Sequence, residues 1–427
     1  MSKTKTAVHD AVGFREETIR ALVEGRLRFH EISNDLSAAE AAGVRREALE
    51  RITHTRLDAI GHHSFDAGHA ASRNCENIIG VAQIPMGVVG PLTVRGEHCD
   101  GDVYVPLATT EGALLASINR GCAAIRLAGG AAVHVEDVGM TRAPVFRTTG
   151  HGQTRAFLAW VRQHEEDIRA VAAATSRYLT LTEIRPYSFG SSIFLRFRFT
   201  TGDAMGMNMA TIACDRIVRE LIEPQTGIPC VALSGNYCVD KKAASVNFSE
   251  GRGKRIHAEI VLDAATLRDA LKTDAAAIAE VQYRKNLLGS IAAGAMGYNA
   301  HYANVLSAFF IATGQDPAHV VGGSTGVTCI EPREDGAIYA SIFIPDAPLG
   351  AIGGGTSLDT QAEALAILGV APEPERPGHA VMRLAEILGA AVLAGELSLM
   401  AAFTSRDLAR AHERLGRGAA PRGDARA

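Results

Sequence analysis

Residues 179–187 (LTLTEIRPY) and 192–202 (SIFLRFRFTTG) decide the fold class, because they are two strand-like segments in close succession. Two more strand-like segments and two helical segments accompany them, at 131–138, 143–149, 156–178 and 208–222. This alternation of strands and helices predicts a compact α+β domain built on an antiparallel sheet.

The regions on either side of this domain differ in character. Upstream, residues 8–60 repeat apolar side chains at helical spacing, and residues 76–108 are extended and punctuated by Gly and Pro. A helix is predicted to open at Thr109-Thr110 and to end at Gly129. Downstream, strands, Gly-rich turns and long helices return, with apolar helical turns over 379–415.

The composition argues against several functional classes. The net charge is −4, so no strong field favours nucleic acid or an acidic membrane. The seven cysteines are an odd number without CxxC spacing, which indicates neither a disulfide framework nor a zinc site and favours a reducing cytosol. The opening residues, MSKTKTAVHDAVGF, lack the apolar core of a signal peptide.

One segment resembles a membrane span in composition. Residues 286–315 contain no Asp, Glu, Lys or Arg, but Asn299, His301 and Asn304 lie among them. A lipid-facing helix would bury these polar groups without partners. We therefore expect a central helix buried in protein and no membrane span.

Lys241 is the most informative candidate for chemistry. It lies in SGNYCVDKK (234–242), directly after Asp240. A fixed ammonium group can stabilise an oxygen that becomes negative during a reaction. The alternative is a solvated Lys-Lys pair that follows a turn.

Three other side chains suit related tasks. Glu111, at the first turn of the predicted helix, can donate a proton if its pKa is raised, or it can simply cap the helix. Asp316 can be the neighbouring carboxylate, or an acid in a helix C-terminal turn. His412, in LARAHERL, has the ordinary pKa near 6.5 that suits protonation of a thiolate, or is a solvated helix residue.

Several separated motifs together resemble 3-hydroxy-3-methylglutaryl-CoA (HMG-CoA) reductase, in a soluble form similar to class I. The resemblance runs from about residue 60 to about residue 412. The motifs are ENIIGVAQIPMGVVGPL (76–92), ATTEGALLASINRGCAAI (108–125), GDAMGMNM (202–209), SGNYCVDKK (234–242), GQD (314–316), GAIGGGT (350–356) and AGELSLMAA (394–402). Each motif is weak alone, but their joint order is specific.

The resemblance implies a reaction and four catalytic residues. The reaction is the NADPH-dependent four-electron reduction of HMG-CoA to mevalonate and free CoA. It implies that Lys241 stabilises the oxyanion, Glu111 donates the proton, Asp316 lies between them, and His412 protonates the departing thiolate.

It also implies which residues contact the substrate and the cofactor. The substrate contacts would be Arg142, Ser234, Lys285, Asn304, Ser117, Asn119, Arg120 and His301. The NADPH contacts would be Ser176, Arg177, Asp203, Met205, Gly206, Met207, Asn208 and Lys242. No GxGxxG opens a helix after a strand, so a Rossmann loop is not expected. No metal site is expected.

The same resemblance implies the domain organisation and assembly. A helical N-terminal region (1–75) would precede a large α/β substrate domain (76–143 and 233–412). A small ferredoxin-like cofactor domain (144–232) would be inserted in it, and 413–427 would form a flexible tail. The enzyme would be cytoplasmic, and a homodimer or homotetramer with shared active sites.

Two alternatives stay open. One is a degradative enzyme of the same fold that oxidises mevalonate with NAD. The other is a catalytically silent homologue that binds acyl-CoA, since fold alone does not guarantee function.

Overall fold

The computed structural model describes residues 3–32 and 35–405, and it separates the chain into two units. One unit consists of Met1–Pro85 with Ser357–Ala362, and the other of Met86–Thr356 with Glu363–Ala427. Both helices and strands are present, so the predicted mixture of the two is confirmed.

The first unit is helical, as the periodicity of residues 8–60 predicts. Its second helix begins at a capping box, in which the side chains of Ser37 and Glu40 each accept a backbone N–H from the other residue. Ile19 of the first helix and Val44 of the second share a small apolar core. The helices are α1 (Lys3–Val23), α2 (Ala38–Thr53) and α3 (Ala67–Arg73).

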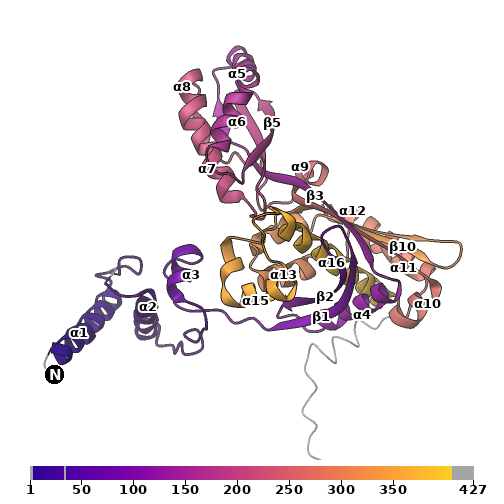
Figure 1. Cartoon of the computed structure of the whole chain (residues 1–427), viewed down its shortest axis with the longest axis horizontal. Helices are drawn as coiled ribbons and strands as arrows, with labels where there is room; N and C mark the ends of the chain where they lie inside the picture. The colour runs from indigo at the N-terminus through magenta and orange to yellow at the C-terminus, as the bar shows by residue number, and fades with distance from the viewer. Residues whose placement is uncertain (1–2, 33–34, 406–427) are drawn as a thin grey trace, which may run out of the picture. The chain divides into compact units, whose positions relative to one another are not determined.

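The second unit is built on a ten-stranded sheet (Figure 1). Its main path runs in the order β7-β4-β6-β3-β8-β10-β9, while β1 pairs with β2 and β3, and β5 pairs with β6. Among the pairings between strands of the described residues, only the short β1–β3 pairing is parallel. The strands are β1 (Met86–Arg95), β2 (Asp100–Ala108), β3 (Ala131–Arg142), β4 (Val145–Arg147), β5 (Thr180–Phe189), β6 (Ser192–Thr200), β7 (Cys230–Ala232), β8 (Arg252–Leu262), β9 (Val327–Pro332) and β10 (Ile338–Ala347).

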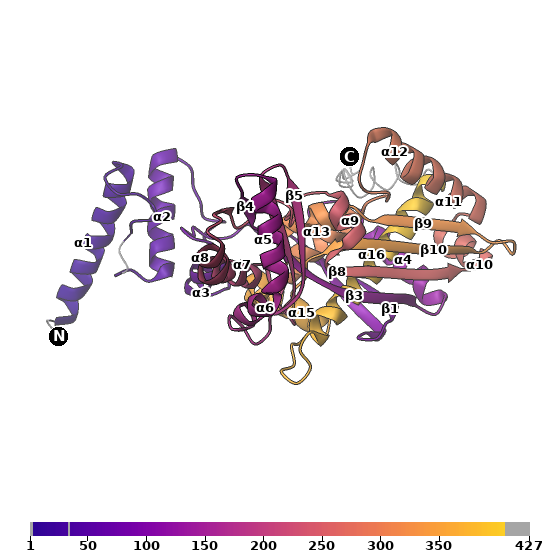
Figure 2. The same cartoon turned by 90° about the horizontal axis from the view of Figure 1, so that it is seen from above.

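Strand β3 joins the two halves of this sheet. Its residues 132–139 pair with β8, and its last three residues, 140–142, pair with β6. Figure 2 shows β3, β8, β10 and β9 running side by side. Because one strand pairs with both halves, the smaller half is joined to the larger one by a continuous sheet.

The smaller half has its own apolar core. Phe146, Phe157, Phe197 and Ile217 are fully buried there, between the strands β4–β6 and the helices that cover them. These helices are α5 (His151–Gln163), α6 (Glu165–Ala173), α7 (Met207–Ile217), its continuation η1 (Val218–Ile222) and α8 (Glu223–Thr226). They gather at one end of the sheet in Figure 1.

The larger half packs around the long helix α16 (His379–Ser405). Two buried carboxylates interrupt its apolar surface. Glu386 accepts the backbone N–H groups of residues 97–99, and Glu396 accepts those of Ala300 and His301 and the hydroxyl of Thr328. Both anions are therefore fully supplied with donors inside the protein.

Helix α16 is the one described helix that is long and apolar enough to cross a membrane. Within its most apolar stretch, 83% of the residues are buried inside the protein. The two buried glutamates also have specific protein partners, so this helix is a core element of the second unit.

Two expectations about helices were wrong. The helix predicted from Thr109 is α4 (Leu114–Leu127), because Ala113 adopts a left-handed φ of 73° and Glu111 lies in the preceding turn. The uncharged run 286–315 is not one buried helix, because Gly294 ends its first part with a left-handed φ of 68°.

That first part is also partly exposed, since Ile291 retains 61% of its accessible surface. The uncharged run is therefore covered by the end of η3 (Gln282–Gly289), α12 (Ser290–Ala293) and α13 (Tyr302–Thr313). The remaining elements are α9 (Ser245–Glu250), α10 (Ala264–Thr266), η2 (Leu267–Leu271), α11 (Ala275–Val281), η4 (Pro317–His319), α14 (Val320–Gly323), η5 (Gly354–Ser357) and α15 (Asp359–Ile367).

Candidate active site

The loop between β7 and α9 carries Lys241 in a constrained backbone. Asn236, Val239 and Lys241 have left-handed φ values of 63°, 49° and 58°. Such values are strained for a β-branched residue like Val239 and persist only where the surroundings hold them. Here Asn247 donates to the Val239 carbonyl at 3.0 Å, and Thr141 donates to the next carbonyl upstream at 3.1 Å.

Lys241 and Asp316 form an ion pair, with 2.8 Å between Nζ and Oδ2. Asp316 follows α13 and also accepts the N–H of Ala318 at 3.0 Å. Burial favours a raised pKa for Asp316, but the hydrogen bonds from Lys241 and Ala318 and the charge of His319 leave the pKa below its ordinary value. The Asp316 carboxyl group is therefore ionised at neutral pH.

Both members of the pair stay accessible. Their side chains retain 43% and 34% of their surface. An ammonium group that is oriented by a carboxylate and still open to solvent can meet a substrate oxygen.

Glu111 and Asn304 form a second pair. Asn304 donates from Nδ2 to Glu111 Oε2 at 2.7 Å, and the backbone of Glu111 donates to Thr109 Oγ1. The structure thus brings together two predicted site residues that are far apart in the chain. Across the described part of the chain, no ion pair or hydrogen bond joins Glu111 to Lys241.

A buried charged cluster lies behind Lys241, and the sequence reasoning missed it. Arg252 is fully buried and donates to Asp240 Oδ1 at 2.7 Å, with Asp346 Oδ1 at 3.9 Å. Asn247 donates to Asp346 Oδ2 at 2.8 Å. Burial raises the pKa of Asp346 to about 6, against the lowering effect of Arg252. The available signal was GRGK (251–254), in which two charged residues occupy alternate positions; the structure places both of them inside the protein at the start of β8.

The predicted substrate contacts are dispersed along the second unit. Arg120 and Ser117 both bond Ser398 of α16, at 3.0 Å in each case, and Asn119 accepts the N–H of Gly90. Arg142 donates to Thr211 from two nitrogens, at 2.6 and 3.0 Å. These groups are held in place by the protein's own polar groups.

Three other predicted contacts have weaker anchors. Ser234 lies 3.5 Å from the Cys238 sulfur, and the Lys285 ammonium lies 5.3 Å from the ring centre of Phe403. The Nε2 atom of His301 is buried and makes no hydrogen bond to the described residues. His412 lies outside the described residues.

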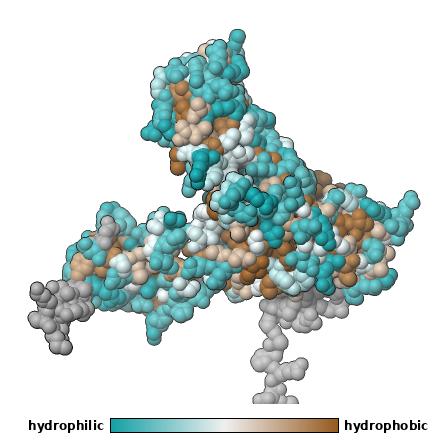
Figure 3. All heavy atoms as spheres, in the orientation of Figure 1, coloured by the Kyte–Doolittle hydropathy of each residue, from teal (hydrophilic) through white to brown (hydrophobic). Residues whose placement is uncertain are grey.

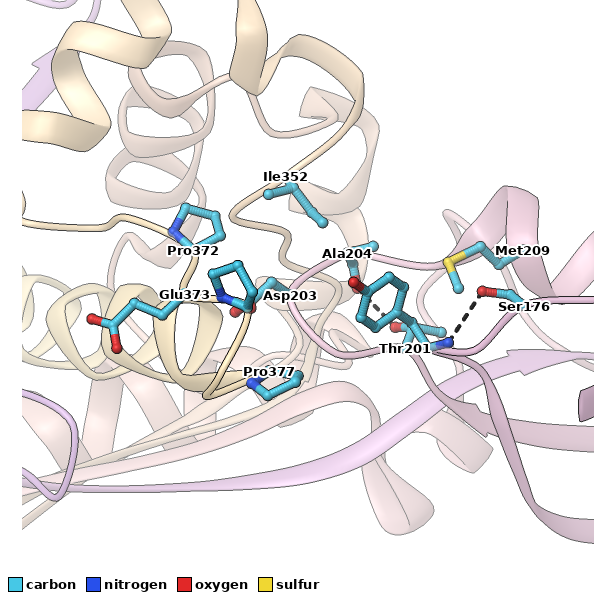
Figure 4. A pocket seen from close by; sticks show the side chains of 11 residues that line it. Ser176, Thr201, Asp203, Ala204, Met209, Ile352, Pro372, Glu373 and Pro377 are labelled. Carbon is cyan, nitrogen blue, oxygen red and sulfur yellow. Dashed lines mark hydrogen bonds between the residues drawn. The ribbon is translucent and has the colours of Figure 1, made fainter.

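A cavity of about 250 Å³ contains two of the predicted cofactor residues, Ser176 and Asp203. Figure 4 shows Pro372, Glu373 and Pro377 on one side of it and Ser176 and Met209 on the other. The lining residues are Ser176, Tyr178, Thr201, Asp203, Ala204, Met209, Ile352, Pro372, Glu373, Pro374 and Pro377.

Asp203 and Arg177 are already engaged beside this cavity. The Asp203 carboxylate accepts the N–H groups of Gly378 and Val381 at 2.9 and 3.0 Å, at the start of α16. The Arg177 guanidinium lies 4.6 Å from the ring centre of Tyr178 and donates to its hydroxyl. Asp203 therefore joins the two halves of the unit through a helix cap.

The other predicted cofactor residues surround the start of α7. Gly206 has a left-handed φ of 89°, and a Cβ there would lie 2.2 Å from the Thr201 side chain, so the turn requires glycine. The sulfur of Met207 accepts a hydrogen bond from Arg252 at 3.1 Å, and Lys242 donates to the Asp240 carbonyl at 3.4 Å. Met205 lies against Gly350, and Asn208 is exposed. No cluster of His, Cys, Asp and Glu suited to a metal ion occurs among the described residues.

Comparisons with known proteins agree with one another. The family model described as hydroxymethylglutaryl-coenzyme A reductase matches residues 41–417. A 3-hydroxy-3-methylglutaryl-coenzyme A reductase of Methanothermobacter thermautotrophicus is 51% identical over 93% of this chain and 98% of that protein. One from Pyrococcus abyssi is 46% identical over 94% and 99%.

A solved structure has a similar fold. It is a class II 3-hydroxy-3-methylglutaryl-CoA reductase from Streptococcus pneumoniae bound to NADPH, with a TM-score of 0.62 and 17% identity. The alignment covers 78% of this chain and 89% of that chain.

Proposed function

This chain belongs to the hydroxymethylglutaryl-coenzyme A reductase family of oxidoreductases, and we propose that it reduces HMG-CoA to mevalonate and free CoA with NADPH. The observation that carries the proposal is the Lys241–Asp316 ion pair at 2.8 Å, with both side chains open to solvent. In this proposal mevalonate serves isoprenoid synthesis.

Lys241 would stabilise the oxygen of the thioester carbonyl as it becomes negative. A preorganised donor of this kind contributes a factor of about 10²–10³ in rate. Asp316 orients the ammonium group through the ion pair at 2.8 Å. Because its own pKa is lowered, Asp316 does not take the lysine proton at neutral pH.

Glu111 would deliver the proton to the alcohol oxygen of the final product. Asn304 holds its carboxyl group at 2.7 Å and can contact the acyl group beside it. When the first reduction has been completed, the carbon–sulfur bond breaks and CoA leaves as a thiolate. His412 would protonate that sulfur, so that the thiolate cannot add back to the aldehyde.

When bound, NADPH would supply one hydride per molecule, so the two reduction steps would use two molecules of NADPH in succession. The cavity beside Ser176 and Asp203 is lined by both polar and apolar side chains, which fits part of a dinucleotide. The turn at Gly206 opens α7, whose first N–H groups carry no side-chain cap and suit a pyrophosphate. Arg177, next to the lining, would approach the 2′-phosphate.

The proposed domain organisation follows from these assignments. Residues 76–143 and 233–412 would bind HMG-CoA, and residues 144–232 would form the inserted, ferredoxin-like cofactor domain. The separate apolar core around Phe157 and Phe197 supports this division. Because the seven cysteines form no disulfide with one another, we place the enzyme in the cytoplasm.

We also propose that the enzyme works as a homodimer or homotetramer. Exposed hydrophobic side chains on β1 and β2 support an interface, because Met86, Val88 and Tyr104 retain 43%, 53% and 54% of their surface. Figure 3 shows hydrophobic residues on the visible face of the part of the chain that contains these strands. Sedimentation analysis tests this proposal, and a purely monomeric active enzyme contradicts it.

The test of function is a spectrophotometric assay with HMG-CoA and each nicotinamide cofactor. We expect NADPH to be oxidised only when HMG-CoA is added, and we expect a free thiol to be released. One observation favours the degradative alternative: the described lining of the cavity contains the carboxylate Glu373 and no Lys or Arg. A preference for NADH of about tenfold or more, or for mevalonate oxidation, would establish that alternative. Binding of acyl-CoA without any turnover would establish the silent homologue.

A further inference from the structure

Asn247 connects three parts of the second unit through one side-chain amide. It lies on α9 and is 2% exposed. Its Nδ2 atom donates to the Val239 carbonyl at 3.0 Å and to Asp346 Oδ2 at 2.8 Å, and its Oδ1 atom accepts from Arg196 at 3.1 Å. The nitrogen of an amide has two donor hydrogens, so both of them and the oxygen are used.

These three contacts require an amide at position 247. Aspartate has the same shape, but it would place an oxygen against the Val239 carbonyl and the Asp346 carboxylate. An apolar side chain would leave both acceptors and the Arg196 guanidinium without these hydrogen bonds. Arg196 and Asp346 are themselves buried, so the amide is fixed from two sides before it reaches Val239.

The bond to Val239 holds a backbone conformation that valine avoids. Val239 has a left-handed φ of 49°, which is costly for a β-branched residue. Without a partner for its carbonyl, Val239 would relax toward a negative φ, and the peptide plane between Val239 and Asp240 would turn. Strain of this kind is typical of reactive sites, where the surroundings hold it in place.

The strained residue lies two positions before Lys241. Between them, the Asp240 side chain accepts from the buried Arg252 at 2.7 Å. Lys241 itself has a left-handed φ of 58°, and its ammonium group reaches Asp316 at 2.8 Å. Because that ammonium group ends a long, half-exposed side chain, the direction of its backbone decides whether it meets the carboxylate.

We propose that Asn247 is a positioning residue, which fixes the Val239 carbonyl and thereby directs the Lys241 ammonium at Asp316 and at the reacting oxygen. The proposal rests on the function proposed above. Asn247 does not touch substrate in this assignment, because it is buried and acts through the backbone of the loop between β7 and α9.

The first test is a double-mutant cycle with Lys241. Asn247→Ala should lower kcat by about tenfold and leave the KM for HMG-CoA and for NADPH unchanged, because a displaced cation weakens only the transition state. In a Lys241→Gln protein the same change should cost less than about twofold, because no ammonium group is left to orient. An equal loss in both backgrounds would overturn the proposal.

The second test relieves the strain directly. Glycine adopts a left-handed φ without the steric cost that valine has. Val239→Gly alone should keep the normal kcat, and the double variant Asn247→Ala/Val239→Gly should turn over roughly threefold faster than Asn247→Ala. A double variant that is no faster than Asn247→Ala would show that the amide does not act by holding Val239.

The matched control is Thr154→Ala in α5. Thr154 is 4% exposed, and its hydroxyl contacts the Thr148 hydroxyl at 2.8 Å and donates to the Gly150 carbonyl at 3.2 Å. This variant also loses buried hydrogen bonds, but those bonds stay within residues 148–154. It should melt at a lower temperature with a normal kcat. A loss of kcat equal to that of Asn247→Ala would assign the effect to general destabilisation.

A further readout needs no activity. The proteins are treated with an amine-selective acylating reagent, and peptide mass spectrometry measures the labelling of Lys241 and Lys272. Asn247→Ala should label about threefold faster at Lys241, because the ammonium group leaves its carboxylate partner. Lys272, which is exposed and donates to the Asp269 carbonyl at 2.7 Å, should label at the same rate in every variant.

The outcomes separate the two proposals. Unchanged labelling of Lys241 in Asn247→Ala would overturn the positioning role, whatever the activity. If the unchanged enzyme fails to oxidise NADPH with HMG-CoA, the proposed function fails, and the labelling rates still decide whether Asn247 holds Lys241 against Asp316.

Discussion

Two sets of buried charges in the second unit are built in opposite ways. On α16, the carboxylates of Glu386 and Glu396 are both 1% exposed, and each is supplied with N–H or O–H donors. Behind Lys241, buried polar atoms of Arg252, His319 and Asp346 have no hydrogen-bond partner within the part of the chain that the structure describes. A buried polar group that is hydrogen-bonded avoids the loss of stability that an unpaired one causes.

The contrast sharpens the reading of the candidate site. Removing a charge from α16 should damage the fold and leave the chemistry intact. Removing a charge from the Lys241 region should damage the chemistry and cost little stability.

The largest effect is expected for Lys241→Gln. Loss of the ammonium group should lower kcat by a factor of about 10²–10³, because the oxyanion loses its fixed cation. The melting temperature should hardly change, because half-exposed ion pairs contribute little to stability. Steady-state kinetics and thermal melting measure the two.

The matched control is Lys272→Gln. Lys272 is also exposed and also has a left-handed φ, of 59°, but it lies at the end of η2. Turnover of this variant should equal that of the unchanged enzyme. Equal losses in both variants would point to a general effect of removing surface lysines and remove Lys241 from the mechanism.

Glu386→Gln tests the other side of the comparison. The amide group of glutamine would face the N–H groups of residues 97–99, so one carboxylate acceptor is replaced by a donor. The free energy of unfolding should fall by about 2–4 kcal/mol. Denaturant titration measures it, with the exposed Glu363→Gln as the neutral control.

The kinetics of the Glu386→Gln protein complete that test. The folded fraction of the variant should have the normal kcat, since the hydrogen bonds of this glutamate go to the turn between β1 and β2. A reduced kcat with normal stability would show that Glu386 serves the reaction and not the fold.

Asp346→Asn should produce a smaller, pH-dependent effect. The folded pKa of Asp346 is raised to about 6 by burial, so the folded state binds the extra proton between its ordinary pKa and 6. Stability of the unchanged protein therefore falls as the pH rises through this window. Asparagine removes that loss, which amounts to about 3 kcal/mol.

Thermal melting at two pH values checks the sign of the Asp346 prediction. Near pH 4 the variant and the unchanged protein should melt alike, because Asp346 is then protonated. Near neutral pH the variant should be more stable. The opposite result would be a variant that melts like the unchanged protein near pH 4 but below it near neutral pH. That result would show that the Asp346 carboxylate stabilises the fold, as the Glu386 carboxylate does.

The smallest effect is expected for Glu220→Gln. Glu220 accepts from Arg216 at 3.0 Å, one helical turn away, and both side chains are exposed. The loss should be about 0.3–0.5 kcal/mol and should vanish at high salt. Denaturant titration with and without added salt sets this baseline for an ordinary surface pair.

The sequence predicts much of the scaffold and part of the site. The paired strands at 180–189 and 192–200 and the helix that starts near Asn208 are visible in local patterns, because half-buried elements repeat apolar side chains with a fixed period. The start of α4 was predicted too early, since nothing in the residues themselves indicates the left-handed Ala113. The break at Gly294 was also missed, because glycine is tolerated within helices and marks their ends only in context.

The sequence alone is enough to select Lys241, Glu111 and Asp316 as candidates. Each of them is a charged residue in an apolar segment marked by glycine, and each lies in a short motif that can be recognised without the structure. The partner of each was settled only by the folded chain: Lys241 meets Asp316, and Glu111 meets Asn304. Those contacts join residues far apart in the chain, and so does the approach of His319 and Arg252 to Asp240. These contacts form because β8 and η4 pack against one loop. The spacing of residues along the chain does not predict which side chains will meet in a buried space.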